Sequence, residues 1–199
     1  MTAMTPGSNV PLSVPRVAVD VAAPSARLDV SGLLLTGDGK VRSDDDFVFY
    51  NQPQGPGVTH RSGGGSGPDT ITVDTAAVPA GIEKIVVTAS LDGGGPFAGT
   101  TPTATVRGAD DGSVIATFTP TGLGPETALV VVEVYRRGGA WKVRAVGQGY
   151  ANGLAGIATD FGVNVDEPAA PAAPAPAASV SAPPPPLAAM PSAPPPTGA

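Results

Sequence analysis

The chain has 199 residues, a formal charge of −6 and a pI near 4.5. With only 11 Lys and Arg residues it is a poor candidate for binding nucleic acid, because neutralising phosphates needs clustered basic groups. It contains no cysteine and one histidine, His60, which excludes disulfides, thiolate zinc sites and thiol catalysis. Carboxylate oxygens are the one plentiful class of metal ligand, and they suit calcium or magnesium.

Two features of the sequence bear on where the protein works. No run of 18 apolar residues is present, so we expect no membrane-spanning helix. The segment Met1–Val14 has neither a basic region nor an apolar region of the kind found in signal peptides. We therefore expect a cytoplasmic protein.

Short runs of β-branched and apolar residues, separated by Gly, Pro and Asp, recur along the chain. They predict strands at Arg16–Val21, Leu28–Leu35, Phe47–Asn51, Thr70–Asp74, Glu83–Leu91, Thr103–Arg107, Ser113–Thr119, Leu129–Arg137 and Trp141–Gln148. One short helix is expected within Tyr150–Phe161, and a long loop rich in Gly, Pro and Ser within Gln52–Pro68. This pattern predicts an all-β fold, an antiparallel β-sandwich of Greek-key type with a short C-terminal helix.

The composition changes abruptly near residue 167. Residues 168–199 are mostly Ala, Pro and Ser, carry no charged side chain and hold 12 of the chain's 24 prolines. Such a segment cannot build a core, and its prolines disfavour helices and sheets. We expect a β-sandwich domain over residues 1–167 and a disordered Pro/Ala-rich tail over residues 168–199.

The densest charge in the chain is the run Asp44, Asp45 and Asp46, directly before the aromatic segment that starts at Phe47. Two like charges about 6 Å apart repel by roughly 3 kcal/mol at an effective dielectric constant near 20. The cluster therefore needs either water or a cation. Its spacing differs from that of an EF-hand loop, which alternates its oxygen ligands, so spacing alone favours a solvated loop.

The segment Tyr135–Leu154 reads YRRGGAWKVRAVGQGYANGL and resembles a signature of the TerD family, the tellurium-resistance and general stress proteins. Residues 160–165 (DFGVNV), 39–51 (GKVRSDDDFVFYN) and 7–12 (GSNVPL) also resemble that family, as does the Glu-Thr-Ala at 126–128. The resemblance covers about residues 5–165.

The resemblance implies a calcium-binding β-sandwich without enzymatic chemistry. It also implies a cytoplasmic protein that takes part in resistance to tellurite and other stresses. Its partners would be proteins of a stress-response assembly near the membrane, with peripheral membrane association and no integral membrane segment. It implies no nucleic-acid partner.

Carried over residue by residue, the acidic motifs of the family survive unevenly. The matching metal ligands are Asp29, Asp44, Asp46 and Asp69, helped by Asn51, whereas Arg27 stands where the family has a carboxylate. Because calcium takes six to eight oxygens and binds more tightly with more carboxylates, these losses weaken the site. We expect one weak calcium site and too few carboxylates for a second.

Two alternatives remain open on the sequence. One is a divergent, metal-free interaction scaffold that uses the sandwich surface and the proline-rich tail. It differs from the calcium hypothesis in whether the four carboxylates converge. The other is an enzyme that uses Glu126 and Glu133 as an acid–base pair. We disfavour it because Glu133 lies in an apolar strand, where it would pair with an arginine such as Arg144 or face solvent.

Overall fold

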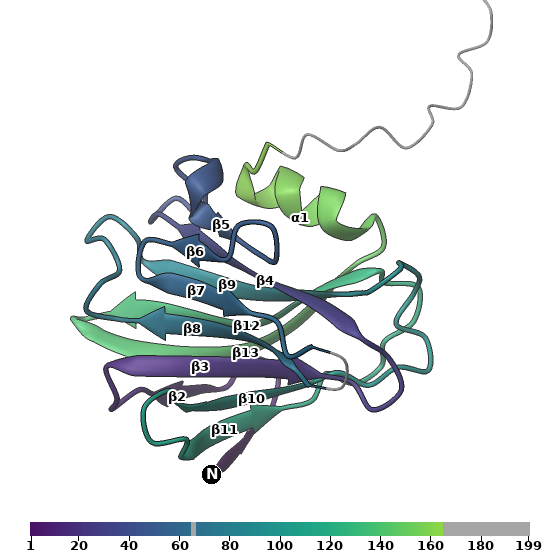
Figure 1. Ribbon diagram of the computed structural model, residues 1–199, viewed down its shortest axis with the longest axis horizontal. Coiled ribbons are helices and arrows are strands. Elements are labelled where there is room, and N and C mark those ends of the chain that lie inside the picture. Colours follow the sequence, from purple (N-terminus) through teal and green to yellow (C-terminus); the bar gives the residue numbers. More distant parts are fainter. Residues whose placement is uncertain (65–66, 165–199) are drawn as a thin grey trace, which may run out of the picture. The chain divides into compact units, whose positions relative to one another are not determined.

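The computed structural model describes residues 1–64 and 67–164, which form two packed β-sheets and one α-helix (Figure 1). The predicted β-sandwich with a short C-terminal helix is thereby confirmed. The expected tail, residues 168–199, lies outside the described residues.

One sheet has seven strands in the order β1-β11-β10-β3-β8-β7-β6. Their bounds are β1 Thr2–Met4, β3 Arg16–Ala22, β6 Gln54–Gly55, β7 Val58–Arg61, β8 Asp69–Asp74, β10 Thr103–Gly108 and β11 Val114–Phe118. All neighbours are antiparallel except β1 and β11, which are parallel. The strands β10 and β11, which match the predicted strands Thr103–Arg107 and Ser113–Thr119, pair as an antiparallel hairpin.

The other sheet has six strands in the order β2-β13-β12-β9-β4-β5, all antiparallel. Their bounds are β2 Asn9–Pro11, β4 Leu28–Leu35, β5 Phe47–Val48, β9 Lys84–Leu91, β12 Ala128–Arg137 and β13 Ala140–Tyr150. The short 3₁₀ helix η1, Asp44–Asp46, precedes β5, and the α-helix α1 covers Gly153–Phe161.

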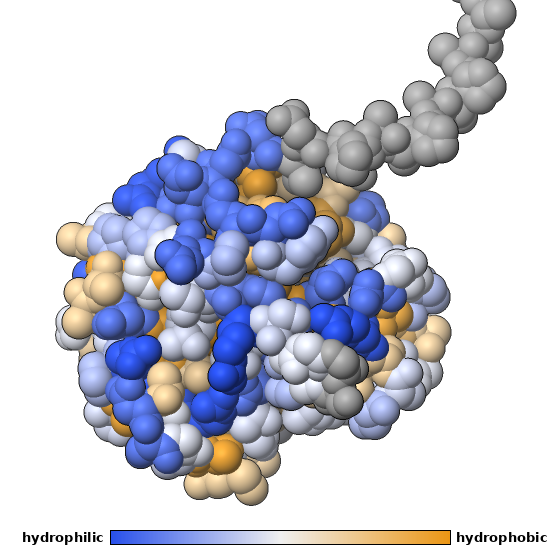
Figure 2. Space-filling view, viewed as in Figure 1, coloured by the Kyte–Doolittle hydropathy of each residue, from blue (hydrophilic) through white to orange (hydrophobic). Residues whose placement is uncertain are grey.

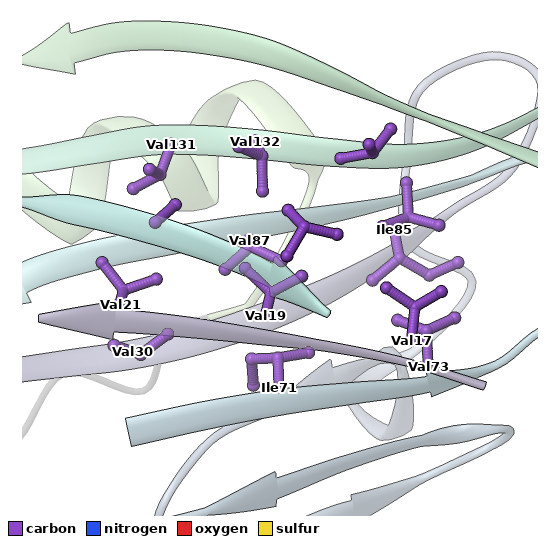
Figure 3. Packing of buried hydrophobic residues seen from close by; sticks show 14 of the residues in the cluster. Val17, Val19, Val21, Val30, Ile71, Val73, Ile85, Val87, Val131 and Val132 are labelled. Atoms are coloured by element: carbon purple, nitrogen blue, oxygen red, sulfur yellow. The ribbon is translucent and has the colours of Figure 1, made fainter. Parts of the chain in front are cut away.

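The core lies between the two sheets and consists mainly of β-branched side chains, which suit a pleated surface. Figure 3 shows side chains from β3, β4, β8, β9 and β12 meeting there: Val17, Val19, Val21, Val30, Ile71, Val73, Ile85, Val87, Val131 and Val132. Each is at most 2 % exposed. This apolar layer fixes the relative positions of β4, β8 and β9, whose ends carry the charged residues described below.

A second, smaller apolar cluster covers the outer face of the six-stranded sheet. Ile157 of α1 packs there with Leu33, Val86 and Val130 from β4, β9 and β12. Val41 is tied to the helix because its backbone N–H donates to the carbonyl oxygen of Phe161 at 3.0 Å. The segment that leads into η1 is thus anchored to α1.

A β-bulge in β12 and β13 explains the glycine-rich sequence at residues 147–149. The register shifts between Val130 and Val132, so both Val131 and Val132 face the core. Gly147 in β13 has φ +70°, and a Cβ atom there would lie 3.1 Å from the Cζ atom of Phe118. Only glycine suits both the backbone and the space.

The structure corrects the predicted elements in three places. The predicted strand Phe47–Asn51 ends at Val48, because Phe49 and Gln52 pair across a tight turn. The predicted loop Gln52–Pro68 contains the hairpin of β6 and β7. The sequence analysis also missed β1 and β2, which are three-residue edge strands without an alternating pattern.

Replacing Gly147 with Ala should lower the stability of the domain. The left-handed backbone costs an L-residue about 1–2 kcal/mol, and the contact with Phe118 adds to it. In a domain of this size that loss lowers the melting temperature by about 2–8 °C. Gly139→Ala is the matched control, since Gly139 has φ +78° and open space at its Cβ position. Equal losses in the two thermal melts would show that the contact with Phe118 has no effect.

Candidate cation-binding site

The structure separates the four predicted carboxylate ligands into two pairs at opposite ends of β4. Asp29 lies near the start of β4, whereas Asp46 is the last residue of η1 and directly precedes Phe47, which pairs with Leu33. Four strand positions from Asp29 to Leu33, and one further residue step to Asp46, separate the two carboxylates by roughly 16 Å. Figure 1 shows β4 running from the end near the start of β8 to the end beside η1. One ion cannot bridge both pairs.

Asp46 is held by an arginine of its own loop. Arg42 donates from Nε to Oδ2 at 2.9 Å and from Nη2 to Oδ1 at 2.7 Å, and its backbone N–H donates to Oδ2 at 2.9 Å. Burial acts to raise the pKa of Asp46, but these bonds outweigh it and the pKa lies below its ordinary value. Both carboxylate oxygens of this fully buried residue are therefore already paired.

The other predicted residues of this loop point to water. Asp44, Asp45 and Asn51 are exposed, and Gln52 braces the loop by donating to the carbonyl oxygens of Asp44 and Phe47 at 2.8 Å each. We name residues Arg42–Asn51 the acidic loop. Its deepest carboxylate is neutralised by Arg42, so the acidic loop does not fit a calcium ion.

Asp69, at the start of β8, is also buried and hydrogen-bonded. Its Oδ1 accepts from the Ser62 hydroxyl at 3.1 Å and from the Gly63 backbone N–H at 3.0 Å. Its Oδ2 lies 3.2 Å from Nε2 of His60. Because a carboxylate only accepts, this histidine nitrogen carries the proton and donates it.

Asp29 has a different environment. It is half-buried, and burial, Asp92 and Asp69, in that order, raise its pKa, while Arg27 and His60 act to lower it. Within the described part of the chain, no hydrogen bond or ion pair to its carboxylate is found. The Asp29 carboxylate therefore carries charge that its surroundings do not fully balance.

Arg27 completes this group of charges. Its Nε lies 3.4 Å from Oδ2 of Asp92, and its Nη2 donates to the Ser62 hydroxyl at 3.0 Å. We name the group of Arg27, Asp29, His60, Ser62, Asp69 and Asp92 the acidic end. It lies beside a pocket of about 320 Å³ lined by residues 21–28 and 67–69.

Three residues of the acidic end are not among the ligands predicted from the sequence: Asp92, His60 and Ser62. The signal for Asp92 is the register of β4 and β9, which pairs Leu28 with Leu91 and so brings Arg27 and Asp92 together. The signal for Ser62 and His60 is the pairing of β7 with β8. This pairing is not evident from the sequence, because the segment Gln52–Pro68 has the composition of a Gly-rich loop. Strand pairing of this kind is not encoded in local sequence patterns.

The hard oxygens of the acidic end match the chemistry of calcium, with three carboxylates and one hydroxyl. Their present arrangement matches it less well, because Asp92 is paired with Arg27 and Asp69 is hydrogen-bonded through both oxygens. Among residues 1–64 and 67–164, no three His, Asp or Glu side chains are gathered as closely as a metal site requires. The oxygen ligands of the acidic end fit a calcium ion only if Arg27 moves away from Asp92.

The glutamates considered as an acid–base pair have structural partners. Glu133 is 5 % exposed and pairs with Arg144 and with Lys84, the latter at 2.9 Å. The expected contact with Arg144 is thereby confirmed. Glu126 accepts from the Gly124 backbone N–H at 2.6 Å, a bond that lowers its pKa. Both carboxylates therefore take part in structural contacts.

The two-sheet sandwich, the GQGY bulge and the acidic loop together define a TerD-type domain. The family model of the TerD domain matches residues 3–161, and the chain belongs to this family. It is 38% identical over 152 residues to tellurium resistance protein TerD of Serratia marcescens, covering 69% of this chain and 78% of that protein. It is 37% identical over 151 residues to general stress protein 16U of Bacillus subtilis, with the same coverage.

Solved structures show the same fold. A homologue of telluride resistance protein (TerD) from Streptomyces coelicolor A3(2) aligns with a TM-score of 0.57 at 18% identity, covering 73% of this chain and 96% of that one. The protein SAV2460, of unknown function, aligns with a TM-score of 0.59 at 19% identity, covering 75% and 99%. No helix in the described residues is long and apolar enough to cross a membrane.

Asp46→Asn should destabilise the domain by about 1.5–3 kcal/mol, because hydrogen bonds to charged groups contribute about that much. The pKa of Asp46 is lowered in the folded state, so its stabilisation is present above pH 4 and is lost as the pH falls below that value. Thermal melts at pH 7 and pH 3 measure both effects. Asp44→Asn, at an exposed position of the same helix, should change stability by less than about 0.5 kcal/mol. Equal effects of the two variants at pH 7 would contradict the role of Arg42.

Asp29→Asn should stabilise the domain, in contrast to Asp46→Asn, which should destabilise it. The pKa of Asp29 is raised, so the folded state is disfavoured when Asp29 is ionised and is relieved as the pH falls. Removing the charge should therefore raise the melting temperature at pH 7 in chelator, and the gain should disappear near pH 3. Asp45→Asn, which removes an exposed carboxylate, serves as the control. A lower melting temperature for Asp29→Asn at pH 7 would show that the Asp29 charge is stabilising.

Proposed function

We propose that this protein is a non-enzymatic stress-response protein that contributes to resistance against tellurite and other stresses by binding protein partners. The observation that carries the proposal is the TerD family match over residues 3–161. It is supported by the names of its relatives, a tellurium resistance protein, a general stress protein and a chemical-damaging agent resistance protein of Clostridium acetobutylicum. Glu126 is bonded to the Gly124 backbone and Glu133 is paired with Lys84 and Arg144, and these structural contacts also favour binding over catalysis.

The acidic loop is the surface that we propose for partner contact. Tyr50 is 61 % exposed there, on the same loop as the exposed residues Asp44 and Asp45. Its ring meets the ring of Phe49 edge-on, with centroids 5.5 Å apart, and Phe49 stacks on Phe47. An exposed tyrosine supported by aromatic neighbours offers a large contact area at little cost in side-chain entropy. By contrast, most of the surface in Figure 2 is polar, with hydrophobic residues in small groups.

A survival assay tests this function. The chain is expressed in a bacterial strain that lacks its own TerD-family genes, and survival is measured under tellurite and under an oxidant. The full chain should restore survival, and Tyr50→Ala should reduce the rescue while leaving the melting temperature within about 1 °C, as expected for a surface substitution. Val114→Ala, at another exposed apolar residue, is the control. Failure of the unaltered chain to rescue would contradict the proposed role.

A second candidate function is calcium binding, and the observation that favours it is the unbalanced charge of Asp29. We propose one weak calcium site at the acidic end, with Asp29, Asp69 and Asp92 as the residues that would hold the ion. Calcium would supply charge neutralisation there. The acidic loop is disfavoured as the site because Arg42 already holds Asp46.

Calcium titration of the chelator-stripped protein should give a dissociation constant near 10⁻³ M, in the range of weak calcium modules. At ten times that concentration the ligand stabilises the native state by about 1.4 kcal/mol, which raises the melting temperature by about 3–6 °C. Asp29→Asn plus Asp92→Asn should abolish the effect, whereas Asp44→Asn plus Asp46→Asn should preserve the heat of binding. The reverse result would assign the site to the acidic loop.

A further inference from the structure

Arg27 connects three parts of the chain that carry the acidic end. It precedes β4, pairs with Asp92 at the end of β9, and donates to Ser62 in the segment between β7 and β8. The Ser62 hydroxyl in turn donates to Oδ1 of Asp69. One guanidinium group therefore reaches two carboxylates, one directly and one through a hydroxyl, and its charge also acts on Asp29.

The charges gathered at the acidic end make this connection necessary. Arg27 reaches the Asp92 carboxylate directly and the Asp69 carboxylate through the Ser62 hydroxyl. His60 already donates to Asp69, and its charge depends on protonation. Arg27 is therefore the one permanent positive charge among these groups.

We infer that the Arg27 guanidinium is the resident cation of the acidic end, and that a divalent ion can bind there only by displacing it. The calcium part of this inference rests on the second candidate function above. The part that concerns the stability of the acidic end holds without any metal.

The two arginines of the carboxylate clusters differ in how firmly they are held. Arg42 makes a bidentate pair with a carboxylate that is 1 % exposed, at 2.7 and 2.9 Å. Arg27 lies 3.4 Å from a carboxylate that is 51 % exposed. The two arginine side chains are themselves equally exposed, so the difference lies in the distance and in the carboxylate. Exposed ion pairs are weak because water competes for both partners. Arg27 can therefore turn into solvent and release Asp92, whereas Arg42 stays in place.

Variants of Arg27 test the inference through calcium titration by calorimetry on the full chain. Arg27→Gln removes the resident charge, and Arg27→Asp also adds an oxygen ligand. We expect calcium to bind at least tenfold more tightly to both variants than to the unaltered chain, and most tightly to Arg27→Asp. Arg137→Asp makes the same charge change at the far end of β12. Arg137 lies nine strand positions, roughly 30 Å, from Ala128, which shares a row of the sheet with Asp29. The Arg137→Asp variant should bind calcium like the unaltered chain.

Arg27→Gln also gives a metal-free readout, which serves if Arg27→Asp does not fold. In chelator at low salt, the melting temperature of this variant at pH 7 should fall below that of the unaltered chain, because the positive charge beside Asp92 is lost. Arg137→Gln should leave the melting temperature unchanged.

The outcomes separate the inference from the calcium proposal. Calcium binding by Arg27→Asp but not by the unaltered chain would refute the natural calcium site and support the resident cation. Equal calcium affinity in Arg27→Gln and the unaltered chain would overturn the inference while leaving the calcium site intact. If no variant binds calcium, the thermal melt in chelator decides, and an unchanged melting temperature of Arg27→Gln would overturn the inference.

Discussion

Neutralisation of closely spaced carboxylates by arginine is the interaction on which the account of this protein depends. A carboxylate taken out of water needs a cation or several hydrogen-bond donors, because burial disfavours its ionised form. Arg42 supplies a positive charge and hydrogen-bond donors to Asp46, and Arg27 supplies a positive charge to the group around Asp29. Both arginines come from the chain itself. The buried carboxylate of the acidic loop is thus balanced by Arg42, and the charges of the acidic end are partly balanced by Arg27.

The sandwich decides which charges meet. The apolar layer between the sheets fixes the register of β4 with β9, and that register brings Arg27 to Asp92. The same strand, β4, keeps the two carboxylate pairs roughly 16 Å apart, because each residue advances an extended strand by about 3.3 Å. A domain of the TerD family can therefore keep its fold while its two carboxylate clusters are neutralised in different ways. One carboxylate is held in a bidentate pair with Arg42, and the other cluster has only a longer, exposed contact with Arg27.

The sequence predicted the sandwich, the C-terminal helix and most strand positions, because alternation and glycine-rich turns are local signals. It missed the short edge strands β1 and β2, which carry no such signal. For the site, the sequence predicted one metal site with Asp29, Asp44, Asp46 and Asp69, whereas the structure places these residues in two pairs at opposite ends of β4, because sequence motifs do not give distances in space. The roles of Asp92 and Ser62 depend on strand pairing across long separations, so residue patterns alone could not indicate them.

A pair of crystal structures, one grown in chelator and one in 10–20 mM calcium, tests the central claim most directly; that concentration is about ten times the expected dissociation constant. The account predicts that Arg42 holds Asp46 in both crystals. It also predicts that Arg27 leaves Asp92 only in calcium, where an ion joins Asp29, Asp69 and Asp92. An ion between Asp44 and Asp46, with Arg42 displaced, would contradict the account. So would an ion at the acidic end with Arg27 still paired to Asp92.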